Sequence, residues 1–273
     1  MAELGIVDIR EINRVILSVY NYDFSLHALT SYKQRLERLM GMYFIESAEG
    51  LIRKLQNEPD FFDTFLSEIP VPSTEMFRDP SLWRWLREEY FPNHQDRPSG
   101  KLRIWFPFCV SGGELFTLTI LLTEMGILDK VQIIASSLST KSIDTIKQGT
   151  YDFKKLEVSQ ENYKRYNGLY DLSNYYKQDG DHVIRNKTMF ENVEFQKVNL
   201  VFDPAPQNVK LAIFRNNLIY CNPTRQEALL QIIHRSLSAS GFLILGIREK
   251  ISGMAAARDF EIVNETESVY RKK

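Results

Sequence analysis

Residues 102–125 read LRIWFPFCVSGGELFTLTILLTEM, and this stretch decides the fold of the C-terminal half of the chain. Residues 102–109 form an almost unbroken apolar run, which is typical of a buried β-strand. Ser111-Gly112-Gly113 then allows a tight turn, and the apolar residues from 114 to 125 are enough for a buried helix. The stretch therefore predicts a strand, a glycine turn and a helix, the unit from which parallel α/β sheets are built.

The same alternation of strand and helix continues toward the C-terminus. Further buried strands are expected at 132–135, 211–214 and 242–245. Helices are expected from Thr140 and over 224–237, and a final antiparallel pair at 260–263 and 268–271. We therefore expect an α/β domain over 101–273 with a doubly wound, Rossmann-like and mostly parallel sheet. Such sheets bind ligands beyond the carboxyl ends of their strands, near the point where the strand order reverses.

One segment of this half breaks the alternation. Residues 175–185 carry β-type residues on both sides of Asp179-Gly180, a pair that favours a two-residue hairpin turn. We interpret 170–198 as a small antiparallel β insertion in the α/β domain.

The N-terminal half has no strand-like alternation and is expected to be helical. Apolar residues recur at helical spacing from Ile9 to Val19, from near Ser25 or Thr30 to Met40, and over 48–57 and 60–66. We expect a helical domain over 1–70. A connector would follow over 71–100, made of a proline-rich segment, a helix over 81–90 and a polar linker.

Composition restricts the class of protein. Of 273 residues 44% are hydrophobic, and the formal net charge is −1, so no overall charge favours nucleic acid or an anionic membrane. The N-terminus lacks a signal-peptide pattern and the apolar runs are too short to span a bilayer, so we expect a cytoplasmic protein. Both cysteines lie in apolar stretches and are expected to be reduced. The four histidines are far apart and none neighbours a cysteine, so we expect no metal site.

Five stretches, in order, resemble the chemotaxis receptor methyltransferases of the CheR family. They are Thr74-Glu-Met-Phe-Arg78-Asp79, the strand and loop from Arg103 to Leu118, Gly149-Thr-Tyr151, Val193-Glu-Phe195 with Asn199-Leu200, and Arg215-Asn-Asn-Leu-Ile-Tyr220. Each stretch alone is a weak signal, but their order and spacing together are specific and cover nearly the whole chain. The resemblance implies a SAM-methyltransferase fold and an enzyme that uses S-adenosylmethionine (SAM) to methylate glutamate side chains of chemoreceptors.

The residue types at these positions suit the chemistry of SAM. A glycine turn lets backbone approach the amino acid tail, a carboxylate can bind the tail ammonium, and an arginine can hold the tail carboxylate. The resemblance implies that Glu114 binds the ammonium, that Arg78 binds the tail carboxylate or the incoming glutamate, and that Tyr220 lies near the transferring methyl group. Arg78 and Tyr220 are thus the catalytic candidates. The implied cofactor-binding set is Thr74, Arg78, Cys109, Gly112, Glu114, Ser137, Asn199, Leu200, Arg215 and Asn216.

Ordinary structural roles remain open for several of these residues. Glu114 is also a favourable charge for the first turn of a helix, and Arg78 could simply pair with Asp79. Cys109 is better explained by packing than by chemistry, because no histidine or lysine neighbours it in sequence. Arg215 stands at the end of an apolar strand, so it needs either a partner or a place in the pocket.

Departures from the family pattern gather at the cofactor loop. Phe108 stands where the family has its first loop glycine, and phenylalanine does not readily take a positive φ. Gly113 replaces a glutamate and Leu115 a proline. Ser137 stands at the ribose-binding aspartate, and loss of a charge-assisted hydrogen bond costs about 1.5–3 kcal/mol. Three hypotheses follow: a working protein-glutamate methyltransferase, a catalytically inactive relative that binds a receptor or regulates it, and a binder of a different small molecule.

Two further features bear on partners. Lys33, Arg35 and Arg38 form a basic cluster, which could be a solvated helix face. The resemblance implies instead that it meets an acidic helix in the cytoplasmic part of a chemoreceptor or a similar signalling protein. The hairpin around Gly180 could bind a partner by strand addition or be a structural flap. We expect neither nucleic acid binding nor membrane insertion.

Overall fold

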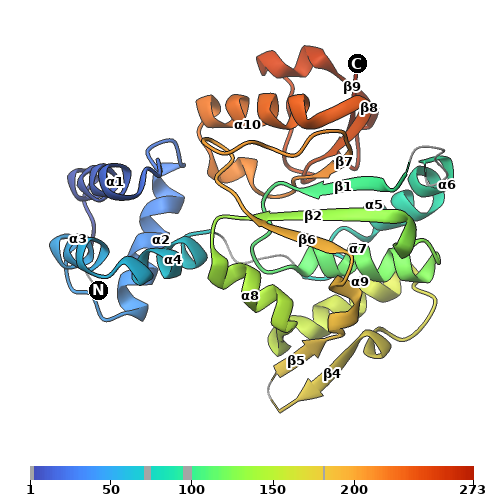
Figure 1. Ribbon diagram of the computed structural model, residues 1–273, viewed down its shortest axis with the longest axis horizontal. Helices are drawn as coiled ribbons and strands as arrows, with labels where there is room; N and C mark the ends of the chain where they lie inside the picture. The colour runs from blue at the N-terminus through green and yellow to red at the C-terminus, as the bar shows by residue number, and fades with distance from the viewer. Residues whose placement is uncertain (1–2, 71–74, 95–99, 181) are drawn as a thin grey trace.

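The computed structural model describes residues 3–70, 75–94, 100–180 and 182–273. Figure 1 shows a group of helices, formed by the first part of the chain, beside a larger α/β domain. The predicted helical N-terminal region and mostly parallel sheet are confirmed. No helix in the described ranges is long and apolar enough to cross a membrane.

The N-terminal helices each bury an apolar face in a shared core. They are α1 (Ile6–Tyr20), α2 (Leu29–Met42), α3 (Ala48–Asn57) and α4 (Pro59–Glu68). Ile9, Ile12 and Ile16, which recur at helical spacing in α1, are at most 2% exposed. Tyr20 of α1 stacks on Phe62 of α4, with ring centroids 3.7 Å apart. This core is distinct from the two cores that cover the faces of the sheet.

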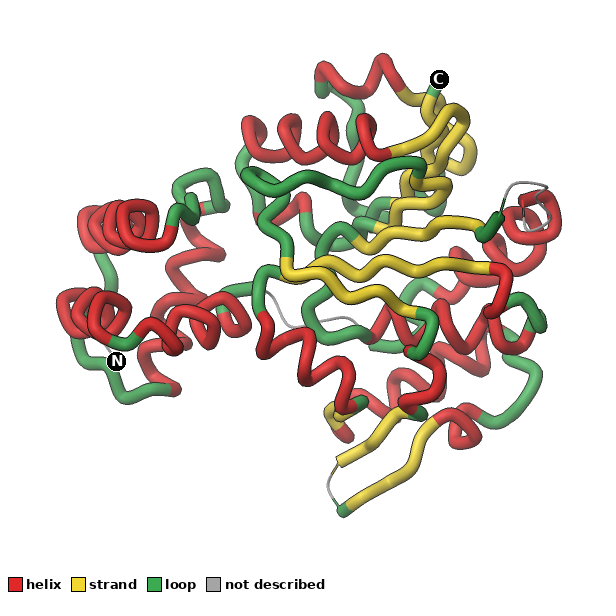
Figure 2. The backbone as a smooth tube through the Cα atoms, viewed as in Figure 1, coloured by secondary structure: helices red, strands yellow, loops and turns green. Residues whose placement is uncertain are grey.

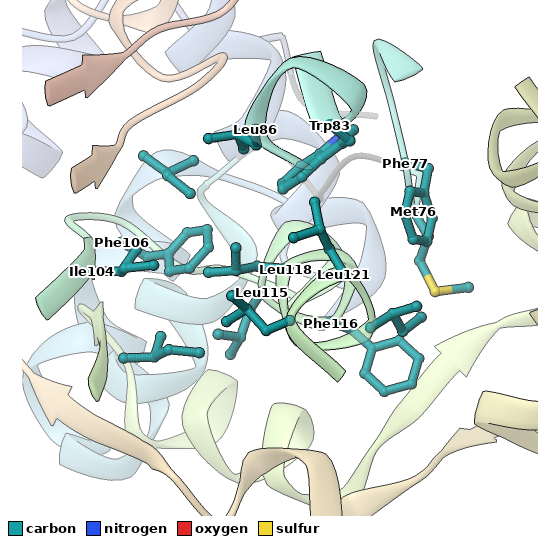
Figure 3. Close-up of a cluster of buried hydrophobic side chains, with 14 of the residues drawn as sticks. Met76, Phe77, Trp83, Leu86, Ile104, Phe106, Leu115, Phe116, Leu118 and Leu121 are labelled. Atoms are coloured by element: carbon teal, nitrogen blue, oxygen red, sulfur yellow. The ribbon is translucent and has the colours of Figure 1, made fainter. Parts of the chain in front are cut away.

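The helix of the connector is anchored in the α/β domain. It comprises α5 (Pro80–Trp85), a π-helical turn η1 (Leu86–Tyr90) and α6 (Phe91–His94). Figure 3 shows Trp83 and Leu86 in one hydrophobic cluster with Leu118 and Leu121 of α7 (Gly113–Glu124). Trp83 and Leu86 are both 0% exposed, so this helix contributes to the core.

The main sheet has the strand order β6-β2-β1-β7-β8-β10-β9 in the described part of the chain. Its strands are β1 (Leu102–Phe106), β2 (Val131–Ser137), β6 (Val193–Lys197), β7 (Val209–Ile213), β8 (Leu237–Ile244), β9 (Phe260–Asn264) and β10 (Val269–Lys272). All neighbouring pairs from β6 to β8 are parallel, whereas β10 is antiparallel to both β8 and β9. From β1 the chain continues to β2 on one side, and β7 pairs on the other side, so the strand order reverses between β1 and β7. A ligand site is expected at this reversal.

Helices cover both faces of the sheet (Figures 1 and 2). α10 (Pro223–Ser236) lies on one face, whereas α7, α8 (Thr140–Gln148) and α9 (Leu156–Tyr166) lie on the other. α7 is buried over most of its surface, and Leu115, Phe116 and Leu118 are 0% exposed. Because α7 is so deeply buried, the loop that leads into it from β1 has a fixed position at the carboxyl end of the sheet.

The β insertion differs from its predicted extent. β4 (Tyr176–Asp179) and β5 (His182–Arg185) form the predicted hairpin, and β3 (Thr150–Asp152), which precedes the expected range 170–198, pairs with β5 as well. β6 lies inside that range but pairs with β2, so it belongs to the main sheet. The sequence did not assign β6 to the main sheet because β6 is an edge strand, with Glu194 and Lys197 in a short VEFQK stretch. Edge strands lack the apolar run of inner strands.

Candidate functional site

A pocket lies at the carboxyl end of β1, where the chain turns into α7. This loop pocket encloses about 550 Å³, including its opening to solvent. It is lined by Arg78, Phe106, residues 108–115, residues 215–217 and Tyr220. Gly112 takes φ +72°, and a Cβ at this position would lie 2.8 Å from Ile146 Cγ2. Glycine is therefore required here by the left-handed backbone and the close approach of Ile146, and Gly112 itself lines the pocket.

Charged side chains of opposite sign line the loop pocket. The side chain of Arg215 is fully buried, and its guanidinium pairs with Asp79 and, at 2.7 Å, with Glu114. Arg78 is exposed and lines the pocket together with Glu114. Burial raises the pKa of Glu114, against the opposing effects of Arg215 and Arg78. A further cation beside Glu114 would stabilise its ionised form, so the pocket suits a zwitterionic ligand.

The segment that carries Arg78 has a strained backbone. Phe77 and Asp79 take φ +55° and +57°, a region that costs non-glycine residues about 1–3 kcal/mol each. The backbone N–H groups of Met76 and Phe77 donate to hydroxyl groups, Ser159 Oγ at 3.2 Å and Thr117 Oγ1 at 2.9 Å. Met76 and Phe77 are also 0% exposed. These buried anchors offset the strain and fix the position of Arg78 at the pocket.

A second pocket lies between the helical domain and the carboxyl edge of the sheet. This interdomain pocket encloses about 800 Å³, including its opening. Its lining from the helical side is Phe24, His27, Ser31, Tyr32, Arg35, Ile69 and Pro70. Its lining from the α/β domain is Phe108, Leu138, residues 198–200, Phe214, Asn217, Tyr220, Cys221, Arg225 and Leu229. Burial, reinforced by Arg225, lowers the pKa of His27 to about 4, so the imidazole is neutral near pH 7 and the walls remain largely apolar.

The two pockets are adjacent. Phe108, Asn217 and Tyr220 line both of them, so the predicted catalytic residue Tyr220 stands at their junction. Phe108 does not take a positive φ, and the left-handed residue of this loop is Gly112. The expectation that a phenylalanine at position 108 would meet a backbone conformation suited to glycine is therefore wrong, and the consequence of Phe108 is the space that its ring occupies.

Most predicted cofactor-binding residues lie at these pockets. Arg78, Cys109, Gly112, Glu114, Arg215 and Asn216 line the loop pocket, and Asn199 and Leu200 line the interdomain pocket. Ser137 lines neither pocket; it is 5% exposed, and its carbonyl accepts a hydrogen bond from the N–H of Val198. Thr74 lies outside the described residues. Burial raises the pKa of Cys109 to about 12, which keeps its thiol protonated.

Arg185 is a buried residue near the site that sequence reasoning missed. It ends β5, is 1% exposed, and donates to the carbonyls of Gly149, Thr150 and Ser111 at 3.2 Å each. Burial lowers its pKa to about 10, so it remains a cation at neutral pH. Because Ser111 belongs to the glycine turn, Arg185 connects the β insertion to the loop pocket. A single arginine at the end of a short strand carries no distinctive sequence signal.

Glu249 is a second buried residue that the sequence analysis missed. It is 3% exposed, and its carboxylate accepts hydrogen bonds from the N–H groups of Asn216 at 2.8 Å, Gly246 at 2.8 Å and Ile219 at 3.2 Å. It therefore holds the segment after β7, which supplies the residues from Arg215 to Tyr220 to the pockets. Its position in a polar loop gave no hint of burial.

Hydrogen bonds at two places hold the helical domain against the α/β domain. Asp63 of α4 accepts from the N–H groups of Thr140 at 3.0 Å and Lys141 at 2.8 Å, at the N-terminus of α8. Elsewhere the N–H of Ala28 donates to the carbonyl of Tyr220 at 2.8 Å, and that of Asn222 to the carbonyl of Leu26 at 2.9 Å. These contacts fix the walls of the interdomain pocket relative to each other.

The three predicted partner-binding cations of α2 have different surroundings. Lys33 lies 3.6 Å from both Glu3 and Glu37, whereas Arg35 lines the interdomain pocket and Arg38 is exposed. At about 100° per residue, Arg35 and Arg38 are roughly 60° apart around the helix, and Lys33 is nearly opposite Arg35. Gly180 is exposed at the hairpin turn, with φ +57°. Within the ranges that the structure describes, no group of three or more His, Cys, Asp or Glu residues is placed to hold a metal ion.

Comparison with known proteins identifies the family. The family profile described as CheR methyltransferase, SAM binding domain, matches residues 72–269. Cher3 of Pseudomonas putida is 30% identical over 266 residues, which cover 97% of this chain and 97% of Cher3. The chemotaxis protein methyltransferase Cher2 of P. putida is 28% identical and covers 81% of this chain and 82% of its own. Chemotaxis protein methyltransferase 1 of Pseudomonas aeruginosa is 28% identical over 81% of each chain. The chain therefore belongs to the CheR methyltransferase family.

Proposed function

We propose that this protein is a SAM-dependent methyltransferase that converts glutamate side chains of a chemoreceptor-like signalling protein into methyl esters. The observation that carries the proposal is the loop pocket, in which a glycine turn at the start of α7 stands beside an exposed arginine, Arg78, and a carboxylate, Glu114. Membership of the CheR family supports SAM as the methyl donor. The names of Cher2 and of the P. aeruginosa relative support a substrate in chemotaxis.

The loop pocket fits the amino acid tail of SAM. Ser111 Oγ and Asn216 Nδ2 are buried atoms without a hydrogen-bond partner in the described structure, and both residues line this pocket. A zwitterionic tail would offer these groups partners. Arg78 would hold the tail carboxylate by charge-assisted hydrogen bonds, and Glu114 would bind the ammonium. Because one oxygen of Glu114 already accepts from Arg215, the carboxylate is held in place before a ligand arrives.

The interdomain pocket fits the nucleoside end of SAM less completely. Leu138, Leu200 and Phe214 provide apolar walls suited to an adenine ring, and Asn199 adds a polar group. Ser137, at the position of the family's ribose-binding aspartate, lines neither pocket. Without a carboxylate on the ribose diol, binding loses about 1.5–3 kcal/mol, which is roughly one to two decades of affinity.

The chain's own residues can orient a glutamate substrate. Bound SAM supplies an electrophilic methyl group on a sulfonium centre. A glutamate carboxylate is ionised at neutral pH and needs no general base. Arg35 lines the interdomain pocket and would attract this carboxylate toward Tyr220 at the junction of the pockets. Holding the carboxylate oxygen in line with the sulfonium centre, in a pocket between two domains, would supply much of the rate enhancement.

A second candidate function is that of a catalytically inactive relative that binds or regulates a receptor. Phe108 and Ser137 favour it, because the first fills space between the two pockets and the second leaves the ribose without a carboxylate. The docking features that such a role would use, Arg35 with Arg38 and the hairpin at Gly180, are exposed or line a pocket in the same structure.

Methyl transfer to a receptor fragment tests the proposal. The purified protein is incubated with methyl-labelled SAM and the cytoplasmic fragment of a chemoreceptor from the same organism. We expect base-labile label on glutamates of the fragment, and a loss of at least about tenfold in rate for Arg78→Ala, since one charge-assisted bond to the ligand is removed. A fragment whose target glutamates are replaced by alanine is the control. Absence of transfer together with retained binding of the fragment would support the inactive relative instead.

A further inference from the structure

Phe108 lies at the junction of the loop pocket and the interdomain pocket. Phe108 lines both pockets and is only partly buried. It also packs against two different hydrophobic cores, the core of the helical domain and the core on the α10 face of the sheet. No other residue of the loop 108–113 lines both pockets. Phe108 is therefore the member of this loop that joins the pockets and the two domains.

A ligand that fills both pockets must pass the junction that Phe108 forms with Asn217 and Tyr220. In SAM and in its product S-adenosylhomocysteine, the amino acid tail and the nucleoside are joined through one sulfur atom, so both ends need a continuous cavity. Methionine or 5′-methylthioadenosine needs only one end of the cavity. Because the backbone at Phe108 has no positive φ, a smaller residue can replace it without a new backbone strain. Position 108 can thus be varied to change the passage between the pockets while the turn at Gly112 is kept.

We propose that Phe108 is a gate that controls entry of ligands spanning the two pockets, and that its movement is coupled to the seating of the helical domain. This inference rests on the proposed function, which supplies the ligand. If the ring must leave its place before the whole ligand binds, the observed association constant is the intrinsic constant multiplied by the fraction of molecules in which the ring has moved. The ring contacts the helical-domain core, so its displacement loosens that contact. The gate therefore affects the spanning ligand and leaves single-end ligands nearly unaffected.

The test compares three ligands on three proteins. S-adenosylhomocysteine, 5′-methylthioadenosine and methionine are titrated calorimetrically into the full chain and into Phe108→Ala and Leu138→Ala. Leu138 is the matched control, because it lines the interdomain pocket alone and also belongs to the helical-domain core. We expect Phe108→Ala to bind S-adenosylhomocysteine at least about tenfold more tightly, while 5′-methylthioadenosine changes by less than about threefold. Leu138→Ala should change both nucleoside ligands in the same direction and by similar factors.

Each other outcome decides the inference. Equal or weaker binding of S-adenosylhomocysteine by Phe108→Ala, with binding by the unaltered chain, would overturn the gate and leave the proposed function intact. Failure of all three folded proteins to bind S-adenosylhomocysteine at millimolar concentration would overturn the proposed function itself. If thermal unfolding shows that Phe108→Ala is not folded, Phe108→Leu replaces it, because leucine keeps a hydrophobic side chain in both cores. We then expect a smaller increase in the affinity for S-adenosylhomocysteine.

Discussion

Arg185 is a cation buried behind the glycine turn. None of its hydrogen bonds in the described structure goes to a carboxylate; its guanidinium donates to three carbonyls and lies 5.4–5.8 Å from the rings of Tyr151, Phe116 and Phe190. A buried charge without a counter-ion is costly, so these contacts must compensate for its desolvation. These contacts bring β5, the start of β3 and Ser111 around one side chain, and only Nη1 of the guanidinium has no hydrogen-bond partner among the described residues. The residue thus fixes where the turn stands relative to the insertion.

Arg185→Lys should destabilise the protein although it keeps the charge. A lysine ammonium cannot reach three carbonyls with the planar geometry of a guanidinium, and hydrogen bonds of charged groups contribute about 1.5–3 kcal/mol each. We expect the free energy of unfolding in urea to fall by about 1.5–3 kcal/mol. Arg165→Lys, at an exposed position of α9, is the matched control and should change it by less than about 0.5 kcal/mol. Equal effects of the two substitutions would contradict the role given to Arg185.

At the scale of single residues, the sequence predicted those site residues that belong to a motif with a fixed spacing. Gly112, Glu114 and Arg215 lie together as expected, because a strand, a turn and a helix bring the first two to one point and Arg215 follows the neighbouring strand β7, which ends at Ile213. Ser137 could not be placed from sequence, since whether a strand's last side chain faces a pocket depends on its neighbours in the sheet. The partners of Arg185 come from elsewhere along the chain, so no local pattern reveals them.

At the scale of elements, the three cations of α2 differ in direction. Arg35 faces the interdomain pocket, Arg38 faces solvent, and Lys33 lies on the side of the helix nearly opposite Arg35. Arg35 lines the interdomain pocket and Arg38 is exposed, so we propose that these two arginines, rather than Lys33, meet an acidic partner. Lys33 has nearby carboxylates of its own in Glu3 and Glu37. The basic surface of this helix is therefore narrower than the sequence cluster indicated.

Arg35→Glu with Arg38→Glu should weaken binding to an acidic receptor fragment. Reversal of two charges replaces attraction by repulsion during encounter, so association should slow by about tenfold or more at low salt, and the difference should shrink as salt is added. Surface-based binding kinetics at two salt concentrations would measure this. The matched control Lys33→Glu should have a much smaller effect. If Lys33→Glu weakens association as strongly as the double variant, the proposed face of α2 is wrong.

The elements themselves were predictable to different degrees. The helix over 48–57 and the hairpin around Gly180 are confirmed, because helical spacing and an Asp-Gly turn are local signals. β6 was not recognised as a strand of the main sheet, since its pairing with β2 is settled by the fold and not by an apolar run of its own. α9 (Leu156–Tyr166) was not predicted, because its buried face consists of Leu156, Ser159, Tyr163 and Tyr166 and has a single aliphatic residue.

On the scale of the whole molecule, Asp63 connects the helical domain to α8. Burial alone would raise the pKa of Asp63, but hydrogen bonds from Lys141, Lys197, Thr140 and Ser139 outweigh it and lower the pKa from 3.8 to about 2. A carboxylate with a lower pKa in the folded state adds stability that is present above about pH 4 and is lost as the pH falls through about 2. The contact between the domains should therefore weaken in acid.

Asp63→Asn should remove this acid-dependent contribution. Near neutral pH the variant should unfold at a lower urea concentration than the unaltered chain, because asparagine cannot supply a charged acceptor to the N-terminus of α8. Below about pH 4 the difference between the two should shrink, since protonation of Asp63 removes the same charge from the unaltered chain. Asp60→Asn, an exposed change in the first turn of the same helix, is the control. A difference that stays constant from pH 7 to about pH 2 would contradict the assignment.

Calorimetric titration with S-adenosylhomocysteine tests most directly whether the two pockets form one site for SAM. We expect one ligand bound per chain, with an affinity that Glu114→Gln and Arg78→Ala each reduce by about tenfold or more through loss of a charge-assisted contact. Thermal unfolding with and without the ligand would show that the variants remain folded. No heat and no thermal stabilisation of the unaltered chain at millimolar ligand would contradict the claim and leave a protein that keeps the fold for its partners.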